Sequence, residues 1–252
     1  MHALLTVAYV GTRYAGWQRQ TNALAVQEVL EKALSRLAAG AVTTIGAGRT
    51  DAGVHAEGQA VSIALPRELP ASALVLGANA ELPADVRVLA AREVPAGFDA
   101  RREAAAKLYR YRLSRAAPIA PAARPFVVPA PRELDPAALG AAALALVGHH
   151  DFAAFALAGG AAATTARRVF AAAWEERGEE LVFRIAGEGF LRGMVRSLVG
   201  TLLEVGSGRR SVDGFAALLA AGSARGEAGP TAPAEGLCLE RVDFPPGSST
   251  AR

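Results

Sequence analysis

The sequence predicts one order of strands and helices that occurs twice along the chain. In the first half, apolar periodicity indicates four strands and two helices, at residues 3–10, 26–37, 43–45, 59–65, 71–79 and 85–94. In the second half it indicates the same order, at residues 105–114, 135–147, 167–175, 180–186, 190–205 and 237–244, with a short extra helix at 212–221. Two βαββαβ halves predict an α+β fold of two ferredoxin-like sheets, which either pack together or join edge to edge.

These elements divide the chain into an N-terminal half at residues 1–103 and a C-terminal half at 104–245, followed by a flexible tail at 246–252 whose composition favours disorder. With 52% hydrophobic residues in 252, the chain can form a packed core. The connections at 116–131, 156–163 and 223–235 are expected at the surface, where some could close over a ligand.

No stretch of the sequence predicts a membrane segment. The longest apolar run, residues 137–147, is too short to span a bilayer, and the first residues contain no charged leader. We therefore expect a cytoplasmic protein that does not bind a membrane.

A glycine-rich loop between the second and third predicted strands contains several chemically active side chains. The stretch Gly46–Ala56 places Arg49, Asp51 and His55 among glycines and alanines. Such a loop is expected to be exposed and to hold a carboxylate beside a guanidinium. An ordinary hairpin loop with an Asx-turn at Asp51 fits the same residues, because Asp and Gly both favour turns.

Two further stretches have the composition of nucleic-acid contacts. Basic residues, Arg101 and Arg110 among them, outnumber acids from Asp99 to Arg115 and would attract a polyanion, although a solvated charged strand has the same pattern. The predicted loop 11–25 interleaves Arg13 and Gln18 with aromatic residues, which can bond to phosphates and stack on bases. A tryptophan packed on the core is the alternative for the indole in this loop.

The predicted helix 190–205 has a broad apolar face with two arginines, Arg192 and Arg196, on one side. Each arginine either extends its head group to solvent or pairs with a buried acid, for which Asp51 is a candidate. Gly200 on the same side would let another backbone approach closely. On the strand 107–113, the period of two places Lys107, Tyr109 and Tyr111 on one face. Tyrosines there either pack in the core or stack on an unpaired base, as aromatic residues of RRM-like sheets do.

The residue set narrows the chemistry that the glycine-rich loop could perform. None of the four histidines joins an acid at metal-ligand spacing, a nucleophile elbow for a serine triad is missing, and the loop lacks the lysine of a P-loop. A single carboxylate can instead act on an oxocarbenium-forming sugar carbon, as in retaining glycoside chemistry. On a protein that binds unstacked bases, that carbon would be a ribose C1′.

The chain resembles the tRNA pseudouridine synthases of the A type over nearly its whole length. The string Gly48-Arg49-Thr50-Asp51-Ala52-Gly53-Val54-His55 matches the family's loop without change and is highly specific. Further matches follow in order, at residues 16–20, 26–28, 79–83, 98–101, 109–111, 151–155, 165–167, 190–196 and 234–237.

The resemblance implies a role for each matching residue. Asp51 corresponds to the catalytic aspartate, Tyr109 to the tyrosine that stacks on the target base, and Arg196 to the arginine that pairs with the aspartate. Leu237 would line the uracil pocket, and Arg49 would meet RNA phosphate or hold the loop. Further substrate contacts are assigned to residues of the stretches described above, namely Arg13, Gln18, His55, Arg101 and Arg110.

The resemblance also implies the fold, the reaction and the partners. A central, mostly antiparallel sheet would carry a basic cleft, and a homodimer would bind tRNA. Uridines 38, 39 and 40 of the anticodon stem-loop would be isomerised to pseudouridine without a cofactor, because the isomerisation is redox-neutral. No metal is expected either, as the spacing of the histidines indicates. Asp51 would act either by covalent attack on the sugar or by deprotonation toward a glycal. A non-catalytic RNA-binding protein and a nucleoside hydrolase remain the alternatives, although a hydrolase would ordinarily want a second carboxylate.

One departure from the family pattern is visible after the first predicted strand. The family usually has Tyr-Asp-Gly there, whereas this chain has Tyr9-Val10-Gly11. Any polar contact that the acid would make is absent, which affects the expected geometry of residues 11–17 and leaves the chemistry unaffected.

Overall fold

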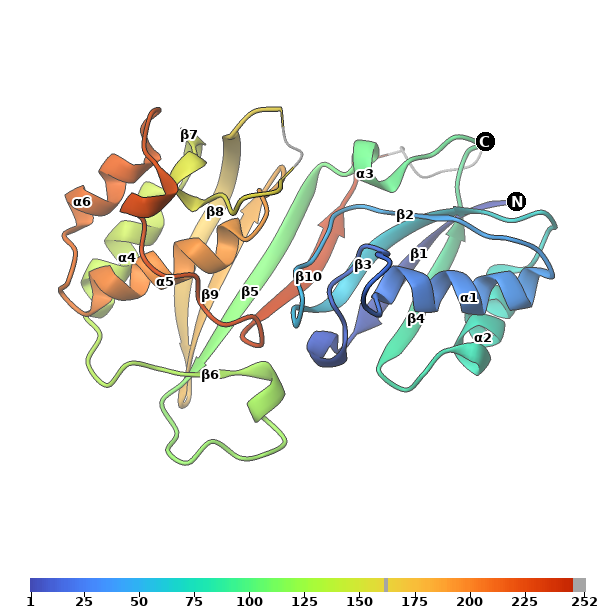
Figure 1. Cartoon of the computed structure of the whole chain (residues 1–252), viewed down its shortest axis with the longest axis horizontal. Coiled ribbons are helices and arrows are strands. Elements are labelled where there is room, and N and C mark those ends of the chain that lie inside the picture. Colours follow the sequence, from blue (N-terminus) through green and yellow to red (C-terminus); the bar gives the residue numbers. More distant parts are fainter. Residues whose placement is uncertain (161–162, 247–252) are drawn as a thin grey trace. The chain divides into compact units, whose positions relative to one another are not determined.

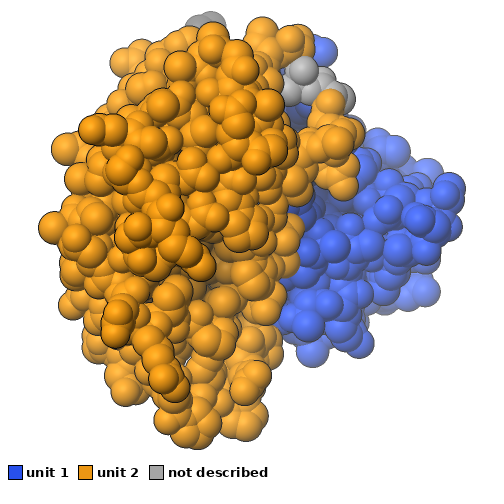
Figure 2. All heavy atoms as spheres, turned by 60° about the vertical axis from the view of Figure 1, so that its left-hand side comes forward, with its two compact units in different colours: residues 1–107, 239–252 blue, residues 108–238 orange. Residues whose placement is uncertain are grey.

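A computed structural model describes residues 1–160 and 163–246. The chain divides into two compact units, unit 1 with residues 1–107 and 239–252 and unit 2 with residues 108–238 (Figure 2). The final strand therefore belongs to unit 1 from Leu239 onward, whereas the sequence pattern placed it with the second half. Of the tail predicted at 246–252, residues 247–252 lie outside the described residues.

Unit 1 follows the predicted order of elements (Figure 1). Its elements are β1 (His2–Tyr9), α1 (Val26–Ala38), β2 (Thr44–Gly46), β3 (His55–Ala64), α2 (Ala71–Glu81), β4 (Val86–Glu93) and the short α3 (Ala100–Glu103). β1 pairs antiparallel with β3 and with β4, and β2 pairs antiparallel with β3. The residues of β10 (Leu237–Asp243) that belong to unit 1 follow β3 in the strand order. The predicted strand–helix order is confirmed for this unit.

The core of unit 1 lies between its sheet and its two long helices. Every second residue of β1 is buried on the face toward the core, including Leu5 and Val7, as the pleat of a strand requires. Leu4 points to the other face, where it is buried in a second apolar cluster with Ala47 and Ala60. The helix α1 buries Leu30 and Leu34, one turn apart, and packs against α2. Burial of each such leucine contributes about 1.5–3 kcal/mol. Helix α1 thus has a fixed position from which its polar side chains reach the neighbouring strand β2.

Unit 2 contains the remaining strands and helices. Its elements are β5 (Ala106–Ser114), β6 (Val128–Pro129), α4 (Pro136–Ala145), β7 (Gly148–Asp151), β8 (Ala166–Arg177), β9 (Glu180–Gly187), α5 (Met194–Gly206) and α6 (Val212–Ala216). The strand order is β5-β9-β8-β7, and β6 pairs in parallel with β5. The pairs β7–β8 and β8–β9 are antiparallel. The chain as a whole is therefore α+β with mostly antiparallel strands, as predicted.

Unit 2 differs from the sequence prediction in several details, and the short β6 in the connection 116–131 is one of them. The strand β7 was not predicted, because its residues Gly-His-His-Asp show no apolar alternation. The helix α5 begins at Met194 rather than at residue 190, since Gly193 adopts φ 67° and a backbone with positive φ cannot continue a helix. The extra helix ends at Ala216 and continues only as a 3-10 turn, Ala217–Leu219.

The connection 223–235 was predicted to lie loosely at the surface, and this is wrong for Gly229 and Ala232, which are buried. The backbone of Gly229 donates a buried hydrogen bond to the Thr201 hydroxyl, 3.0 Å away, and Ala232 is buried. A Cβ on Gly200 would lie 1.7 Å from the carbonyl oxygen of Pro230. The predicted close approach of a backbone at Gly200 is confirmed, and this connection is the backbone that approaches.

Candidate functional site

The glycine-rich loop predicted around Asp51 joins β2 to β3 and occupies residues 47–54, which we call the Asp51 loop. The backbone N–H of Val54 donates to the Asp51 carbonyl at 3.2 Å, and Gly53 has φ 80°, so residues 51–54 form a turn. The Asp51 side chain is half-buried. A turn closed by the Asp51 carbonyl is thus present at this position, and it places a carboxylate at the bend.

Side chains and backbone of β3 hold the first part of the Asp51 loop. The backbone N–H of Ala47 donates to the carbonyl of Ala60 at 2.8 Å. The side-chain amide of Gln59, which is fully buried, donates to the carbonyl of Gly48 at 2.9 Å. These bonds satisfy loop groups that the ladder between β2 and β3 does not reach.

The segment of residues 11–17 lies directly beneath the Asp51 loop. The backbone N–H of Trp17 donates to the carbonyl of Thr50 at 3.1 Å, and that of Gly53 donates to the carbonyl of Tyr14 at 3.2 Å. Gly16 has φ 97°, and a Cβ there would lie 2.5 Å from the Thr50 carbonyl oxygen. Only glycine fits this close approach, which fixes the backbone on both sides of Asp51.

Two buried side chains add to this support. The Tyr9 hydroxyl hydrogen-bonds the Thr50 hydroxyl at 2.9 Å. The Nδ1 atom of His55 accepts a hydrogen bond from the backbone N–H of Gly11 at 3.0 Å. His55 is 4% exposed and is the first residue of β3, so it lies in a strand rather than in the predicted loop. Its ring holds the 11–17 segment against the Asp51 loop.

Trp17 packs in the core of unit 1, as the alternative interpretation of this aromatic loop predicted. It is 2% exposed, and its ring lies 6.0 Å from that of Tyr9. A Cβ on Gly46 would lie 2.6 Å from Nε1 of the indole, so the end of β2 rests on Trp17. The indole therefore supports the loop and is not available to stack on a base.

Asp85, which the sequence reasoning did not single out, provides the acidic contact of the 11–17 segment. Its carboxylate accepts from Arg13 Nε at 2.9 Å and from the Tyr14 hydroxyl at 2.8 Å, and its carbonyl accepts from the Val10 N–H at 2.9 Å. Burial, followed by the hydrogen bond to Asp85, raises the pKa of Tyr14 above its ordinary value. The side chain of Val10 caps nothing, but residues 10–14 are anchored by Asp85 instead.

The basic residues predicted to contact substrate in unit 1 lie at its surface. Arg49, Arg13 and Arg101 are exposed, as is Gln18, whose side-chain amide donates to Gln27 at 2.8 Å. Within residues 1–160 and 163–246, the Arg49 guanidinium makes no ion pair or hydrogen bond. A Cβ on Gly48 would lie 3.3 Å from Lys107 Cε, so the predicted basic stretch reaches the Asp51 loop.

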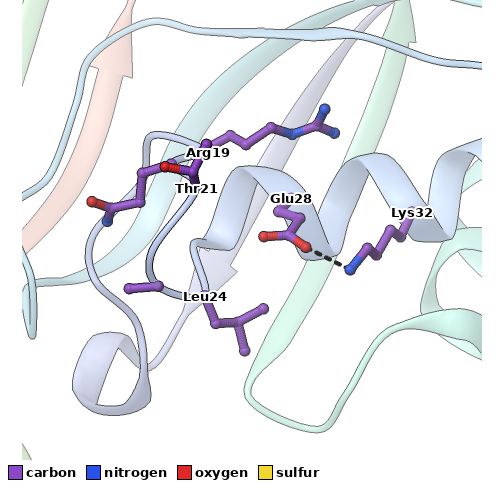
Figure 3. Close-up of a pocket in the computed structure, with 7 residues that line it drawn as sticks. Arg19, Thr21, Leu24, Glu28 and Lys32 are labelled. Carbon is purple, nitrogen blue, oxygen red and sulfur yellow. Dashed lines mark hydrogen bonds and ion pairs between the residues drawn. The ribbon is translucent and has the colours of Figure 1, made fainter.

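A surface pocket of about 420 Å³ lies beside the start of α1. Figure 3 shows the side chains around it, with the Glu28–Lys32 ion pair on α1. Its lining residues are Arg19, Gln20, Thr21, Ala23, Leu24, Glu28 and Lys32. The pocket was not predicted from the sequence, and most of the side chains that line it are polar or charged.

In unit 2, Tyr109 and Tyr111 point from β5 toward buried surroundings, as the period of two predicted. The Tyr109 ring meets Phe190 edge to face, with centroids 5.2 Å apart and planes at 84°. Phe190 precedes α5, so the residues before this helix contribute to the tyrosine's environment. Arg110, on the opposite face of β5, is partly buried.

Arg196 lies in the first turn of α5 and is held by the 230–232 segment. Its Nε donates to the carbonyl of Ala232 at 2.8 Å, and its own carbonyl accepts from the Ala232 N–H at 3.1 Å. Arg192 precedes the helix, and its guanidinium donates to the Ala158 carbonyl at 2.8 Å. The prediction that these two arginines lie one turn apart on one helix is therefore wrong.

Tyr111 connects β5 to the connection that follows Ala232. Its hydroxyl donates to the carbonyl of Pro233 at 2.9 Å, and a Cβ on Gly236 would lie 2.6 Å from its ring. Burial raises the pKa of Tyr111 well above its ordinary value; the charge of Glu235 adds to the shift and that of Arg196 opposes it. Leu237 follows immediately and is 5% exposed. The region thus gathers Tyr111, Arg196 and Leu237 in unit 2.

Residues 1–160 and 163–246 contain no group of three His, Cys, Asp or Glu side chains that could hold a metal ion. None of their helices is both long and apolar enough to cross a membrane.

Comparison with known proteins identifies the family. Residues 5–101 and 142–245 match the family model described as tRNA pseudouridine synthase. The chain is 45% identical over 242 residues to tRNA pseudouridine synthase A of Syntrophotalea carbinolica, covering 96% of both chains. It is 46% identical to that of Myxococcus xanthus, covering 96% of this chain and 92% of the relative, and 41% identical to that of Lacticaseibacillus casei, covering 96% and 99%. The resemblance found in the sequence is confirmed, and the chain belongs to the tRNA pseudouridine synthases, a family of isomerases.

Proposed function

We propose that the protein isomerises uridine to pseudouridine in tRNA, at positions 38, 39 and 40 of the anticodon stem-loop. The observation that carries the proposal is the Asp51 loop: the family's eight-residue string folds into a turn whose backbone is fixed by the 11–17 segment and whose carboxylate is half-buried. Relatives that are 41–46% identical over 95–96% of the chain bear the name tRNA pseudouridine synthase A.

Substrate binding in this proposal depends on exposed cations around the Asp51 loop. Arg49 and Arg101 are exposed, and the Lys107 side chain reaches Gly48. These charges would neutralise RNA phosphates, with Arg13, Gln18 and Arg110 as further contacts. His55 was expected among these contacts, but its buried ring accepts from the Gly11 N–H, so we assign it to support of the Asp51 loop. Extrusion of the target nucleotide from the stem-loop costs a few kcal/mol, which the phosphate contacts would offset.

The chemistry assigned to Asp51 is the transfer of C1′ from N1 to C5 of one uracil. The carboxylate assists cleavage of the N1–C1′ bond, by attack on C1′ or by removal of a ribose proton toward a glycal. The uracil turns in the pocket that Leu237 lines, C5 bonds to C1′, the proton on C5 is lost, and N1 gains a proton. Substrate and product are isomers, so the reaction needs no electron donor or acceptor.

Two residues of unit 2 complete the proposed mechanism. Arg196 would pair with Asp51 and favour its ionised form, as an opposite charge does within a few ångströms. Tyr109 would stack on the target base and accept or relay the proton from C5. Support for Arg196 comes from its bond to the Ala232 carbonyl, which restricts the guanidinium to one orientation.

Four further features belong to the proposal. We propose that each half is ferredoxin-like, for which the order β4-β1-β3, with β2 on β3, gives support in unit 1. We also propose a basic cleft for the RNA, a homodimer and a cytoplasmic location.

The test is tritium release from tRNA that carries C5-labelled uridine. The proposal expects release with the purified protein, and loss of release with Asp51→Asn while tRNA binding persists. Mapping of pseudouridine in the product should place it at positions 38, 39 and 40. A nucleoside hydrolase would release free uracil, and a non-catalytic RNA-binding protein would bind tRNA without tritium release; either result would overturn the proposal.

A further inference from the structure

Glu31 is a buried carboxylate that the proposed mechanism does not use. It lies on α1 and is 4% exposed, whereas the neighbouring Glu28 and Lys32 pair at the surface of the same helix. An ionised carboxylate is stable in such a position only when hydrogen bonds and opposite charge compensate its lost hydration. Its partners therefore indicate what it holds in place.

One oxygen of Glu31 holds the beginning of β2. Oε1 accepts from the backbone N–H of Thr44 at 2.9 Å and from the Thr44 hydroxyl at 3.1 Å. The side-chain amide of Gln27, one turn earlier on α1, donates to the Thr44 carbonyl at 3.0 Å. Two side chains of α1 thus hydrogen-bond the N–H and the carbonyl of Thr44, in the way that a neighbouring strand would.

The other oxygen of Glu31 holds the segment that follows Trp17. Oε2 accepts from the guanidinium of Arg19, whose side chain is 54% exposed and lines the pocket of Figure 3. The backbone N–H of Arg19 donates to Oε1 of Gln27 at 3.0 Å, and the Gln27 N–H donates to the carbonyl of Trp17 at 2.9 Å. The same pair of side chains therefore ties residues 17–19 to β2.

Glu31 joins β2 to the segment after Trp17, and both of these are connected to the Asp51 loop. β2 ends at Gly46, and the Asp51 loop begins at the next residue. Trp17 donates to the carbonyl of Thr50, next to Asp51. We propose that Glu31 is a positioning residue, which sets the distance between β2 and the 11–17 segment and so the placement of the Asp51 carboxylate. This inference rests on the proposed function, because its effect is read in the isomerisation.

The experiment compares Glu31→Gln with the wild-type protein and with Glu28→Gln. Glutamine keeps the volume of Glu31 but places an NH₂ group against Arg19 or the Thr44 N–H, so one of its bonds is lost. The single-turnover rate constant of tritium release at saturating protein should fall about tenfold or more, because small misplacements of a reacting group slow chemistry steeply. The dissociation constant for tRNA should change less than about twofold. Glu28→Gln should match the wild type.

A milder variant keeps the inference testable if Glu31→Gln folds poorly. Thr44→Val removes only the hydroxyl that bonds Glu31, and it should lower the same rate constant about two- to threefold. In the double variant the two losses should not be additive, since both residues belong to one contact. Thermal unfolding identifies the folded fraction, to which each rate is normalised.

Three results would overturn the inference. They are a wild-type rate constant for folded Glu31→Gln, a loss confined to the dissociation constant, and a lowered unfolding temperature with unchanged chemistry in both variants. The proposed function fails on a different result, the absence of tritium release from the wild-type protein, so the two failures are distinguishable.

Discussion

The Tyr14 hydroxyl donates a hydrogen bond to Asp85 Oδ1 at 2.8 Å, and this contact joins the segment beneath the Asp51 loop to the residue before β4. The hydroxyl is part of a buried tyrosine, whereas the Arg13 side chain that shares the carboxylate is 69% exposed. The Tyr14 hydroxyl therefore contributes more to stability than the Arg13 guanidinium, because solvent weakens an exposed ion pair.

We predict that Asp85→Ala lowers the free energy of unfolding by about 1–3 kcal/mol, since it leaves the Tyr14 hydroxyl without its acceptor. Tyr14→Phe removes the hydroxyl itself, so no buried hydroxyl is left without an acceptor. It should lower the free energy of unfolding by about 0.5–1.5 kcal/mol. Arg13→Ala should leave stability nearly unchanged. Urea denaturation measures all three. If Arg13→Ala were as destabilising as Asp85→Ala, the ion pair rather than the tyrosine contact would hold the segment.

Gly16→Ala is predicted to disrupt the Asp51 loop, and Gly97→Ala is its matched control. Both glycines have positive φ, 97° and 82°, but a Cβ on Gly16 would lie 2.5 Å from the Thr50 carbonyl oxygen, whereas a Cβ on Gly97 would have nothing within 4 Å. The control should cost only the backbone term of about 1–2 kcal/mol. Gly16→Ala should cost more in urea denaturation and should abolish tritium release. Equal effects of the two changes would show that the close approach is unimportant.

Gly200→Ala tests whether the 230–232 segment must lie against α5. A Cβ on Gly200 would lie 1.7 Å from the Pro230 carbonyl oxygen, so the segment that bonds Arg196 would have to move. We expect a loss of stability above about 2 kcal/mol, as for overpacked sites, and a strong loss of activity. Gly140→Ala in α4 is the control, because a Cβ on Gly140 would have no atom within 4 Å. This change should raise the free energy of unfolding by about 0.5–1 kcal/mol. Thermal unfolding compares the two, and stabilisation by Gly200→Ala would contradict the packing.

The order of elements could be predicted because each element has a local pattern. The helix α1 buries residues at helical spacing, and β5 alternates buried and partly buried residues. The Asp51 loop could be identified as well, since its eight residues are consecutive. Local patterns do not indicate the sign of φ at a given residue. Phe190 and Leu191 extend the apolar pattern of α5 toward the N-terminus, although the helix cannot begin before Gly193, whose φ is 67°.

The supporting residues could not be predicted because their partners are distant in sequence. Asp85 bonds residues 71 and 72 positions away, and Glu31 bonds Thr44, 13 positions away. A buried acid on α1 looks like any charged residue of an amphipathic helix until the fold places Thr44 beside it. A weak signal was present for Glu31: its position falls between Leu30 and Leu34, on the apolar side of α1.

Tyr111 should make stability fall at high pH. Burial raises its pKa, so the phenol stays protonated in the folded protein after tyrosines of the unfolded chain ionise near about pH 10. The folded state then binds more protons than the unfolded state, and its stability declines as pH rises above that value. Tyr111→Phe should flatten this decline, although it costs about 1 kcal/mol at neutral pH through the lost bond to Pro233. Urea denaturation from pH 8 to 11 measures the slope, and an unchanged slope would contradict the assignment.

Arg196→Lys is predicted to lower the rate of tritium release by on the order of a hundredfold with little change in tRNA binding. Lysine keeps the positive charge but lacks the Nε donor to the Ala232 carbonyl, so it cannot be held in the same orientation. It also cannot form the paired hydrogen bonds that a guanidinium makes to a carboxylate. Arg192→Lys is the matched control, because Arg192 lies outside α5 and its guanidinium bonds only the Ala158 carbonyl among the described contacts. Single-turnover tritium release and filter binding of tRNA measure both variants. Wild-type kinetics for Arg196→Lys would refute the proposed pairing of Arg196 with Asp51.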